Sequence, residues 1–318
     1  MRRSFFPLTL ALCAALAVAA TAESAVKHRL LAADYSAKRI AILAPDGSIE
    51  WQQPVGDIHD LHLLPNGNIL FQRTFQQLVE MDPRTNQVVW QYDAAHANGN
   101  EGRPVEVHAF QRLPNGTTMI VESGPARILE VDRDGKVVKE LKLKVNNPST
   151  HSDTRLARKL SNGHYLVCHE RDGAVREYDA DGKVVWEYEV PLFGMEPKGG
   201  HGPEAFGNQV FSALRLRNGN TLIATGNGHS VLEVTPDKQI VWSVRQNELP
   251  GITLAWVTTL QVLPNGHIVL GNCHAGPDNP QIVEITRDKK VVWTFKDFRN
   301  FGNALANSEV LDAPKSLR

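Results

Sequence analysis

The sequence LPNGNIL at residues 64–70 decides the fold of this chain. Its centre, Asn66-Gly67, is a dipeptide preferred in tight β-hairpins, because Asn and Gly tolerate positive φ angles. The apolar residues on either side therefore predict two short antiparallel strands. The same turn recurs at intervals of roughly 50 residues along the chain. The later copies are Asn115-Gly116, Asn162-Gly163, Asn218-Gly219 and Asn265-Gly266.

A second signature follows each of these turns: an apolar run with one Glu, another turn, and then Val-Val-Trp or a close variant. In the second unit the pattern predicts strands a to d at residues 60–64, 68–72, 78–81 and 87–92. Repeats of this length with about four short strands each are typical of a β-propeller.

The first unit lacks strand a. Residues 30–33, 39–43 and 48–52 supply strands b, c and d, and residues 306–311 at the other end of the chain align with strand a of the sixth unit, 258–263. We therefore expect an all-β, six-bladed propeller with four-stranded antiparallel blades, in which the C-terminal strand completes the N-terminal blade. Closing the ring in this way removes exposed sheet edges.

Residues 1–22 have the pattern of a secretory signal peptide: Arg2 and Arg3, an apolar stretch, and small residues before the expected cleavage site after Ala22. The sequence thus predicts a single propeller domain at 23–318, periplasmic or secreted, with no integral membrane segment after signal removal. Cleavage takes the formal net charge from −1 to −3 by removing two arginines, so nucleic acid is not an expected partner.

Residues that recur in every blade are expected to serve the ring. Tryptophans on strand d are interpreted as packing between blades. They are Trp51, Trp90, Trp186, Trp242 and Trp293. Glutamates on strand c recur in the same way. A ligand or catalytic site should instead break the repeat, and the loops that join strand d to the next strand a do so, because they are long and differ from one another.

Histidines gather on the side of the d–a and b–c loops, at the predicted mouth of the central channel. By the repeat alignment they are His59, His96, His108, His151, His169, His201, His229 and His274. The start of strand a holds equivalent residues in the six blades, namely His59, His108, Arg155, Phe211, Thr258 and Ala306. Two positions earlier, Asp57, Glu106 and Asp153 are expected to share the same side of the strand.

Carboxylates beside imidazoles can orient a general base, support a metal-bound histidine, or hydrogen-bond to a polar ligand. The candidate catalytic residues are His59, His108 and His151. The candidate ligand-binding residues are Asp57, Glu106, Asp153, Arg155, Arg73, His169, His201 and Trp256. No HxH or HExxH spacing identifies metal ligands, so none is assigned, although a metal ion is an option that these residue types allow.

Residues 64–70 with 79–90, and again 177–186, resemble two related groups of propellers: those with pyrroloquinoline-quinone-type repeats and the bacterial arylsulfotransferase-like family. Enzymes of the first group that use the quinone typically have eight blades, and many carry a disulfide between adjacent cysteines. This chain is expected to have six blades and has no adjacent cysteines, so the resemblance does not imply a quinone cofactor. The arylsulfotransferase-like resemblance implies a histidine that accepts the sulfuryl group, at His59 or His108, with Arg155 and Arg73 as anion-binding residues.

Three functions are consistent with these features. The first is an exported propeller that binds a small polar or aromatic ligand, such as a carbohydrate, at the histidine-rich mouth, with Trp256 stacking on the ligand. The second is a histidine-dependent enzyme: an arylsulfotransferase-like or other transferase, a lyase, or a hydrolase. The third is a protein-interaction scaffold in the cell envelope.

Overall fold

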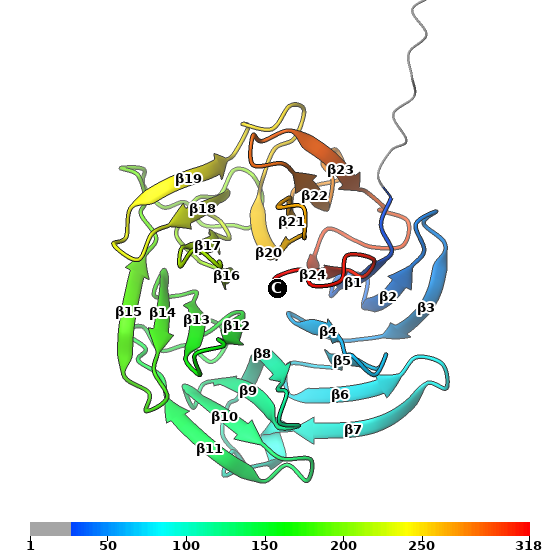
Figure 1. The fold of residues 1–318 in the computed structure, drawn as a ribbon, viewed down its shortest axis with the longest axis vertical. Helices are drawn as coiled ribbons and strands as arrows, with labels where there is room; N and C mark the ends of the chain where they lie inside the picture. The colour runs from blue at the N-terminus through cyan, green and yellow to red at the C-terminus, as the bar shows by residue number, and fades with distance from the viewer. Residues whose placement is uncertain (1–26) are drawn as a thin grey trace, which may run out of the picture.

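A computed structural model describes residues 27–318, which form six four-stranded antiparallel sheets arranged as a ring (Figure 1). The prediction of an all-β, six-bladed propeller is confirmed. The predicted signal peptide at residues 1–22 lies outside the described residues. Within 27–318, no helix combines the length and the apolar character that a membrane crossing requires.

Each blade follows the same order from the channel outwards, strand a to strand d. Blade 1 consists of β24 (Leu305–Val310), β1 (Leu30–Asp34), β2 (Arg39–Leu43) and β3 (Ile49–Pro54). Blade 2 consists of β4 (Leu61–Leu63), β5 (Ile69–Gln72), β6 (Gln77–Asp82) and β7 (Gln87–Asp93). Blade 3 consists of β8 (Glu106–Arg112), β9 (Thr118–Ser123), β10 (Arg127–Val131) and β11 (Val137–Lys142).

The other three blades repeat this arrangement without a crossover. Blade 4 consists of β12 (Ala157–Lys159), β13 (Tyr165–His169), β14 (Ala174–Tyr178) and β15 (Val184–Glu189). Blade 5 consists of β16 (Ser212–Arg215), β17 (Thr221–Ala224), β18 (Ser230–Val234) and β19 (Ile240–Arg245). Blade 6 consists of β20 (Trp256–Val262), β21 (Ile268–Cys273), β22 (Ile282–Ile285) and β23 (Val291–Phe295). A short 3-10 helix, η1 (Ala94–His96), follows β7.

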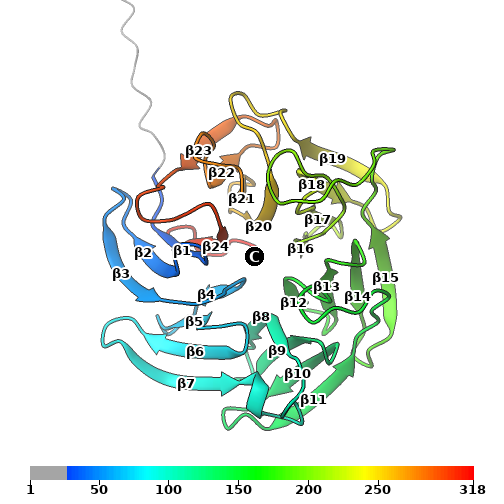
Figure 2. The same ribbon diagram turned by 180° about the vertical axis from the view of Figure 1, so that it is seen from behind.

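The ring closes between the two ends of the chain. Strand β24 pairs antiparallel with β1, from Leu30 opposite Val310 to Asp34 opposite Leu305. Figures 1 and 2 show β24 on the channel side of β1 from both directions. The predicted completion of the N-terminal blade by the C-terminal strand is thus confirmed. The inner edge of every blade therefore faces the central channel.

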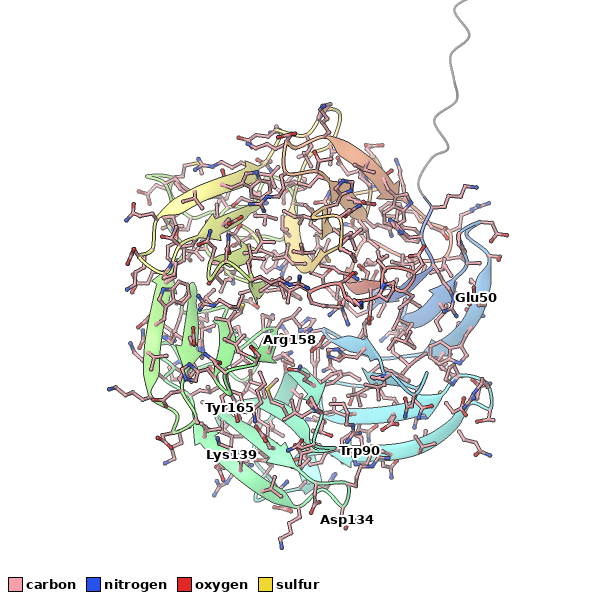
Figure 3. All side chains as sticks on the ribbon, viewed as in Figure 1. Glu50, Trp90, Asp134, Lys139, Arg158 and Tyr165 are labelled. Carbon is pink, nitrogen blue, oxygen red and sulfur yellow. The ribbon has the colours of Figure 1, made fainter. Side chains whose placement is uncertain are left out.

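A repeated contact joins neighbouring blades, and Trp90 illustrates it (Figure 3). The indole Nε1 of Trp90 donates to the carbonyl oxygen of Arg133 in the next blade at 3.0 Å. Arg112, also from the next blade, lies over the indole at 4.7 Å and donates to Glu80 Oε2 at 2.9 Å. The recurring tryptophans and glutamates therefore hold blades together, as their recurrence in five of the six repeats predicted.

The same contact recurs in two further pairs of blades, with Arg215 over Trp186 and Arg287 over Trp242. Blade 3 has Lys139 where the others have tryptophan, and there Lys139 and Lys159 lie over the ring of Tyr165 in blade 4. The next blade's tyrosine thus supplies the aromatic ring that strand β11 lacks.

Below its mouth, the central channel is filled by charged side chains from the innermost strands. Arg158 of β12, near the ring's centre in Figure 3, donates to both carboxylate oxygens of Asp60, at 2.8 and 3.0 Å. Residues after β24 fold back, and Arg318 donates to Glu309 at 2.7 Å and to Asn307 at 3.0 Å. A space of about 10 Å³ lies beside Arg158 and Arg318, and the same two residues line a larger cavity of about 560 Å³ towards the a–b turns. A third cavity, at the mouth, shares no lining residue with these two.

Candidate functional site

A cavity of about 220 Å³ lies at the mouth of the channel, on the side of the d–a and b–c loops. Five of the six blades line it. The lining residues are Tyr35, His59, His151, Ser152, Arg155, Glu170, His201, Gln209, Phe211, Trp256, Thr258, Cys273, His274 and Ala306. The repeat places them, because they lie at the starts of the innermost strands, in the long d–a loops, and where strand b ends.

The six equivalent positions at the start of strand a form the inner layer of this site. In blades 2, 4 and 5 they lie one or two residues before the strand, as His59 does before Leu61 of β4. In blades 3, 6 and 1 the register shifts at this point, at His108, at Thr258–Thr259 and at Ala306. A β-bulge of this kind turns a side chain out of the regular pleat. His108 lies just behind His59, and the other five positions line the cavity.

His59 and His108 form a buried imidazole pair. Their Nδ1 atoms are 2.9 Å apart, and the ring of Phe75 packs 4.8 Å from each of them. The backbone amide of His59 is held by Gln72 Oε1 at 2.8 Å. Burial, together with the positive charge of Arg155, lowers the pKa of His108 to about 3 and holds that of His59 well below its usual range. Both rings are therefore neutral at physiological pH, and one N–H donates to the lone pair of the other.

Glu106 joins this pair to a third imidazole, that of His151. Glu106 Oε2 lies 2.8 Å from His151 Nδ1 and 3.2 Å from His108 Nε2. Burial by itself would raise the pKa of Glu106, but the two imidazoles beside its carboxylate lower it to about 2. His151 is more than half exposed, whereas His108 is fully buried. His151 is thus the imidazole of this group that reaches both the cavity and solvent.

A buried ion pair forms one wall of the cavity. Arg155 Nε contacts Glu170 Oε2, and Arg155 Nη1 donates to the carbonyl oxygens of Thr154, at 3.0 Å, and of His151. Burial lowers the pKa of Arg155 and raises that of Glu170, and each partner's charge opposes the effect on the other. Because Glu170 neutralises Arg155, the pair presents little net charge to a ligand.

Aromatic rings form the opposite wall. The rings of His201 and Trp256 lie 4.8 Å apart at an angle of 33°, and the rings of His201 and His274 lie 5.0 Å apart. The hydroxyl of Tyr35 and Nε2 of His274 form a hydrogen bond of 2.9 Å. Burial, with the charge of His201 adding to it, lowers the pKa of His274 to about 4, so this ring is neutral at pH 7. The rings are inclined to one another, with Trp256 and His274 nearly perpendicular at 83°, so this wall combines aromatic faces with polar ring nitrogens.

The structure brings most of the residues predicted for the site together. His59, His151, Arg155, His201 and Trp256 line the cavity, and Glu106 and His108 contact these residues from behind. These seven residues come from five separate segments of the chain, far apart in sequence.

Four other predicted residues do not line the cavity. Asp57 and Arg73 are exposed elsewhere on this face. The carboxylate of Asp153 accepts the backbone amide of Gly124, at 2.9 Å, and that of Ser149. His169 is enclosed between the carbonyl oxygen of Asp153 and the hydroxyl of Tyr178, both at 2.9 Å. Asp153 and His169 therefore hold the loops of blade 4 in place.

Several lining residues were missed by the sequence analysis. Tyr35 and Glu170 each follow strand b directly, and Gln209 comes from the longest d–a loop. His274 also follows strand b; the repeat alignment placed it at the mouth, but it was not assigned to the site. Phe211 and Thr258 were aligned with His59 but were not assigned to the site. These residues could have been found from their position in the repeat, whatever their type. The ends of the inner strands on this side of the ring all lie at the mouth of the channel.

These features define a six-bladed propeller of the pyrroloquinoline-quinone repeat type with a small aromatic and polar cavity at one mouth. Residues 36–295 match the family model described as outer membrane protein assembly factor BamB. The chain belongs to this family, which confirms the predicted repeat type. No curated protein sequence matches it.

Solved structures with the same fold include that of a Bacteroides caccae protein of unknown function, with a TM-score of 0.73 and 25% identity over 89% of this chain and 98% of that one. A streptogramin B lyase has a TM-score of 0.57 and 14% identity over 86% of this chain and 84% of its own. Virginiamycin B lyase from Staphylococcus aureus has a TM-score of 0.55 and 13% identity, over 87% and 86%. The likeness to the two lyases shows a shared fold.

Proposed function

We propose that this protein binds a small, uncharged polar or aromatic ligand, such as a carbohydrate unit, in the cavity at the channel mouth. The observation that carries the proposal is the composition of this cavity. Residues from five blades line one space of about 220 Å³ with aromatic rings and hydrogen-bonding groups. Ligand sites in proteins combine apolar surface with a few placed polar groups in this way.

Polar side chains line the cavity beside the aromatic rings. They include Gln209 and Ser152, and Thr258 also lines the space, although its hydroxyl oxygen packs against Gly271 of β21. A few placed polar groups of this kind fix the orientation of a bound molecule. Trp256 supplies the face on which a sugar or an aromatic ring would stack.

Ligand binding should depend on Trp256. We expect compounds from a panel of small sugars and aromatic molecules to raise the melting temperature of the protein and to bind saturably in calorimetry. Trp256→Ala removes the stacking face and should abolish that binding, while Trp256→Phe, which keeps the packing, should retain part of it. Phe193→Ala is the matched control, because Phe193 is an exposed aromatic residue of the same loop face outside this cavity. If Trp256→Ala bound these compounds with unchanged affinity, the cavity would not be their binding site.

We also propose that the protein works in the periplasm or outside the cell. Two observations support this proposal: the signal-peptide pattern at residues 1–22, and membership of a family that is described as outer membrane protein assembly factor BamB. That description favours a second candidate function, an interaction scaffold in the cell envelope. A complex with another envelope protein that persists in Trp256→Ala would support the scaffold and separate it from ligand binding.

A histidine-dependent enzyme is the alternative with less support. His59 and His108, the positions that the arylsulfotransferase-like resemblance implies, are buried against one another. An acid, base or nucleophile in this cavity would more readily be His151, which combines exposure with contact to Glu106. The structural neighbours named as lyases share the fold at 13–14% identity, which does not favour lyase chemistry in this chain.

A further inference from the structure

Three potential metal ligands converge beside the cavity. Glu106, His108 and His151 each offer one ligand atom, and these three atoms all lie within 4.8 Å of one another. Oε2 of Glu106 is close both to Nε2 of His108 and to Nδ1 of His151. We propose that Glu106, His108 and His151 bind a divalent transition-metal ion, with Zn²⁺ as the best fit to two imidazoles and one carboxylate. This site goes beyond the proposed ligand binding and does not depend on it.

The distances suit a tetrahedral ion. Zinc bonds of 2.0–2.1 Å place neighbouring ligand atoms about 3.3 Å apart. Oε2 of Glu106 is 3.2 Å from the His108 nitrogen and 2.8 Å from the His151 nitrogen, close to this separation. The two nitrogens are the pair that must be brought closer, and His151, more than half exposed, can move to do so. His108 and Glu106 come from one short stretch of β8, so their spacing is set by the strand.

An unsatisfied nitrogen points to a missing partner at this place. His108 is fully buried, and its Nε2 makes no hydrogen bond within residues 27–318, although the Glu106 oxygen is only 3.2 Å away. Buried polar atoms without partners are rare and need an explanation. A metal ion between the two residues would satisfy the lone pair of Nε2 and the carboxylate together.

The surroundings also favour coordination. Nδ1 of His108 lies 2.9 Å from Nδ1 of His59, so His59 can accept its N–H and leave Nε2 free to bind an ion. The far nitrogen of a metal-bound histidine usually donates to a carboxylate, a backbone carbonyl or water, and here the ring of His59 takes that place. The neighbouring cation, Arg155, is paired with Glu170, which reduces its repulsion of a bound ion. Because His151 lines the cavity, a fourth coordination position would be available to water or to a ligand atom there.

The test is metal binding by the untagged mature protein after treatment with a chelator. Titration with Co²⁺, followed by its visible absorption, and displacement by Zn²⁺, followed by calorimetry, should show one ion per chain. Glu106→Gln and His151→Ala should each weaken the affinity by about tenfold or more. Both variants change partly exposed side chains, and circular dichroism verifies that they fold.

His96→Ala is the matched control. His96 forms an exposed pair with Asp93, at 3.1 Å, and no third ligand joins this pair within residues 27–318, so its loss should leave metal affinity unchanged. Trp256→Ala should also retain the metal while losing the small-molecule ligand, which separates this proposal from the proposed function. The absence of saturable binding to the wild-type protein, or equal affinity in Glu106→Gln, His151→Ala and the wild type, would overturn the site.

Discussion

Arg155 is a charged residue at the cavity that is almost completely buried, with Glu170 as its counterion. Its side chain is 4% exposed, and Glu170, the carboxylate that neutralises it, is 5% exposed. Removal of one partner from a buried ion pair leaves the other charge uncompensated in a poorly solvated place. We therefore expect Glu170→Gln to lower the free energy of unfolding by about 3–5 kcal/mol, measured by urea denaturation.

The control is an exposed pair of the same type. Glu50, at the rim of the ring in Figure 3, lies 2.6 Å from Arg29, and both are about a third or more exposed. Solvent screens this pair, so Glu50→Gln should change the stability by less than about 1 kcal/mol. Equal effects of the two substitutions would mean that Glu170 does not act as the buried counterion of Arg155.

At the residue scale, the sequence predicted which kinds of side chain gather at the mouth better than what each one does there. His59, Arg155 and Trp256 lie in the cavity because the repeat alignment locates the starts of strand a. Asp153 could not be separated from them, because whether a carboxylate meets a ligand or two backbone amides depends on how its loop folds. The role of His169 could not be predicted for the same reason. Its contacts with Asp153 and Tyr178 depend on how other parts of blade 4 fold around it.

At the scale of the element, regular alternation along strand a was too simple an expectation. Glu106 and His108 approach each other even though a bulge in β8 interrupts the pleat between them. Asp57 and His59 both precede β4, where no sheet pairing fixes alternate directions, and Asp57 turns to solvent. Bulges and strand ends are decided by pairing with strand b, so a pattern read within one strand does not reveal them.

The contacts that Arg112 of β8 makes with the neighbouring blade allow a prediction about stability. Its guanidinium reaches back to Glu80 of β6 and to the indole of Trp90 in β7, so one side chain joins blades 2 and 3. Arg112 is 11% exposed and Glu80 is 2% exposed. We expect Arg112→Ala to lower the free energy of unfolding by about 2–4 kcal/mol. Arg112→Lys should cost less than Arg112→Ala, since it keeps the charge but loses the planar stacking.

Arg84→Ala provides the comparison in urea denaturation. Arg84 also pairs with a carboxylate, that of Asp82 at 2.8 Å, but it is 78% exposed and its contact is within one hairpin. Its loss should therefore leave stability nearly unchanged. If Arg112→Ala were as mild as Arg84→Ala, the contact between Trp90, Arg112 and Glu80 would not be what holds these blades together.

At the scale of the whole molecule, the fold was predictable because it repeats. Asn-Gly turns at a regular period define hairpins locally, and the alignment of the last strand with strand a of the sixth unit predicts closure without any knowledge of long-range packing. The cavity is different, because it is made where the repeats differ. Tyr35, Glu170 and Gln209 line the same cavity only once the ring is closed, and their own segments do not predict that they come together.

The closed ring also buries several imidazoles, which should make the molecule sensitive to mild acid. Burial lowers the pKa of His108 and of His169 to about 3, far below the value of about 6.5 in an unfolded chain. Between these values the unfolded state binds a proton that the folded state does not. Stability is therefore fully present above about pH 6.5 and is lost as the pH falls towards 3. Each such histidine should cost about 2 kcal/mol of stability between pH 7.5 and pH 5.

Urea denaturation of the wild type and of His169→Gln at these two pH values tests this. Glutamine can hydrogen-bond but does not titrate, so the loss of stability between pH 7.5 and pH 5 should be smaller in His169→Gln by about 2 kcal/mol. His96→Ala removes an exposed histidine and should leave the wild-type difference intact. If His169→Gln lost as much stability on acidification as the wild type, His169 would have to titrate alike in the folded and unfolded states, contrary to its complete burial between Asp153 and Tyr178.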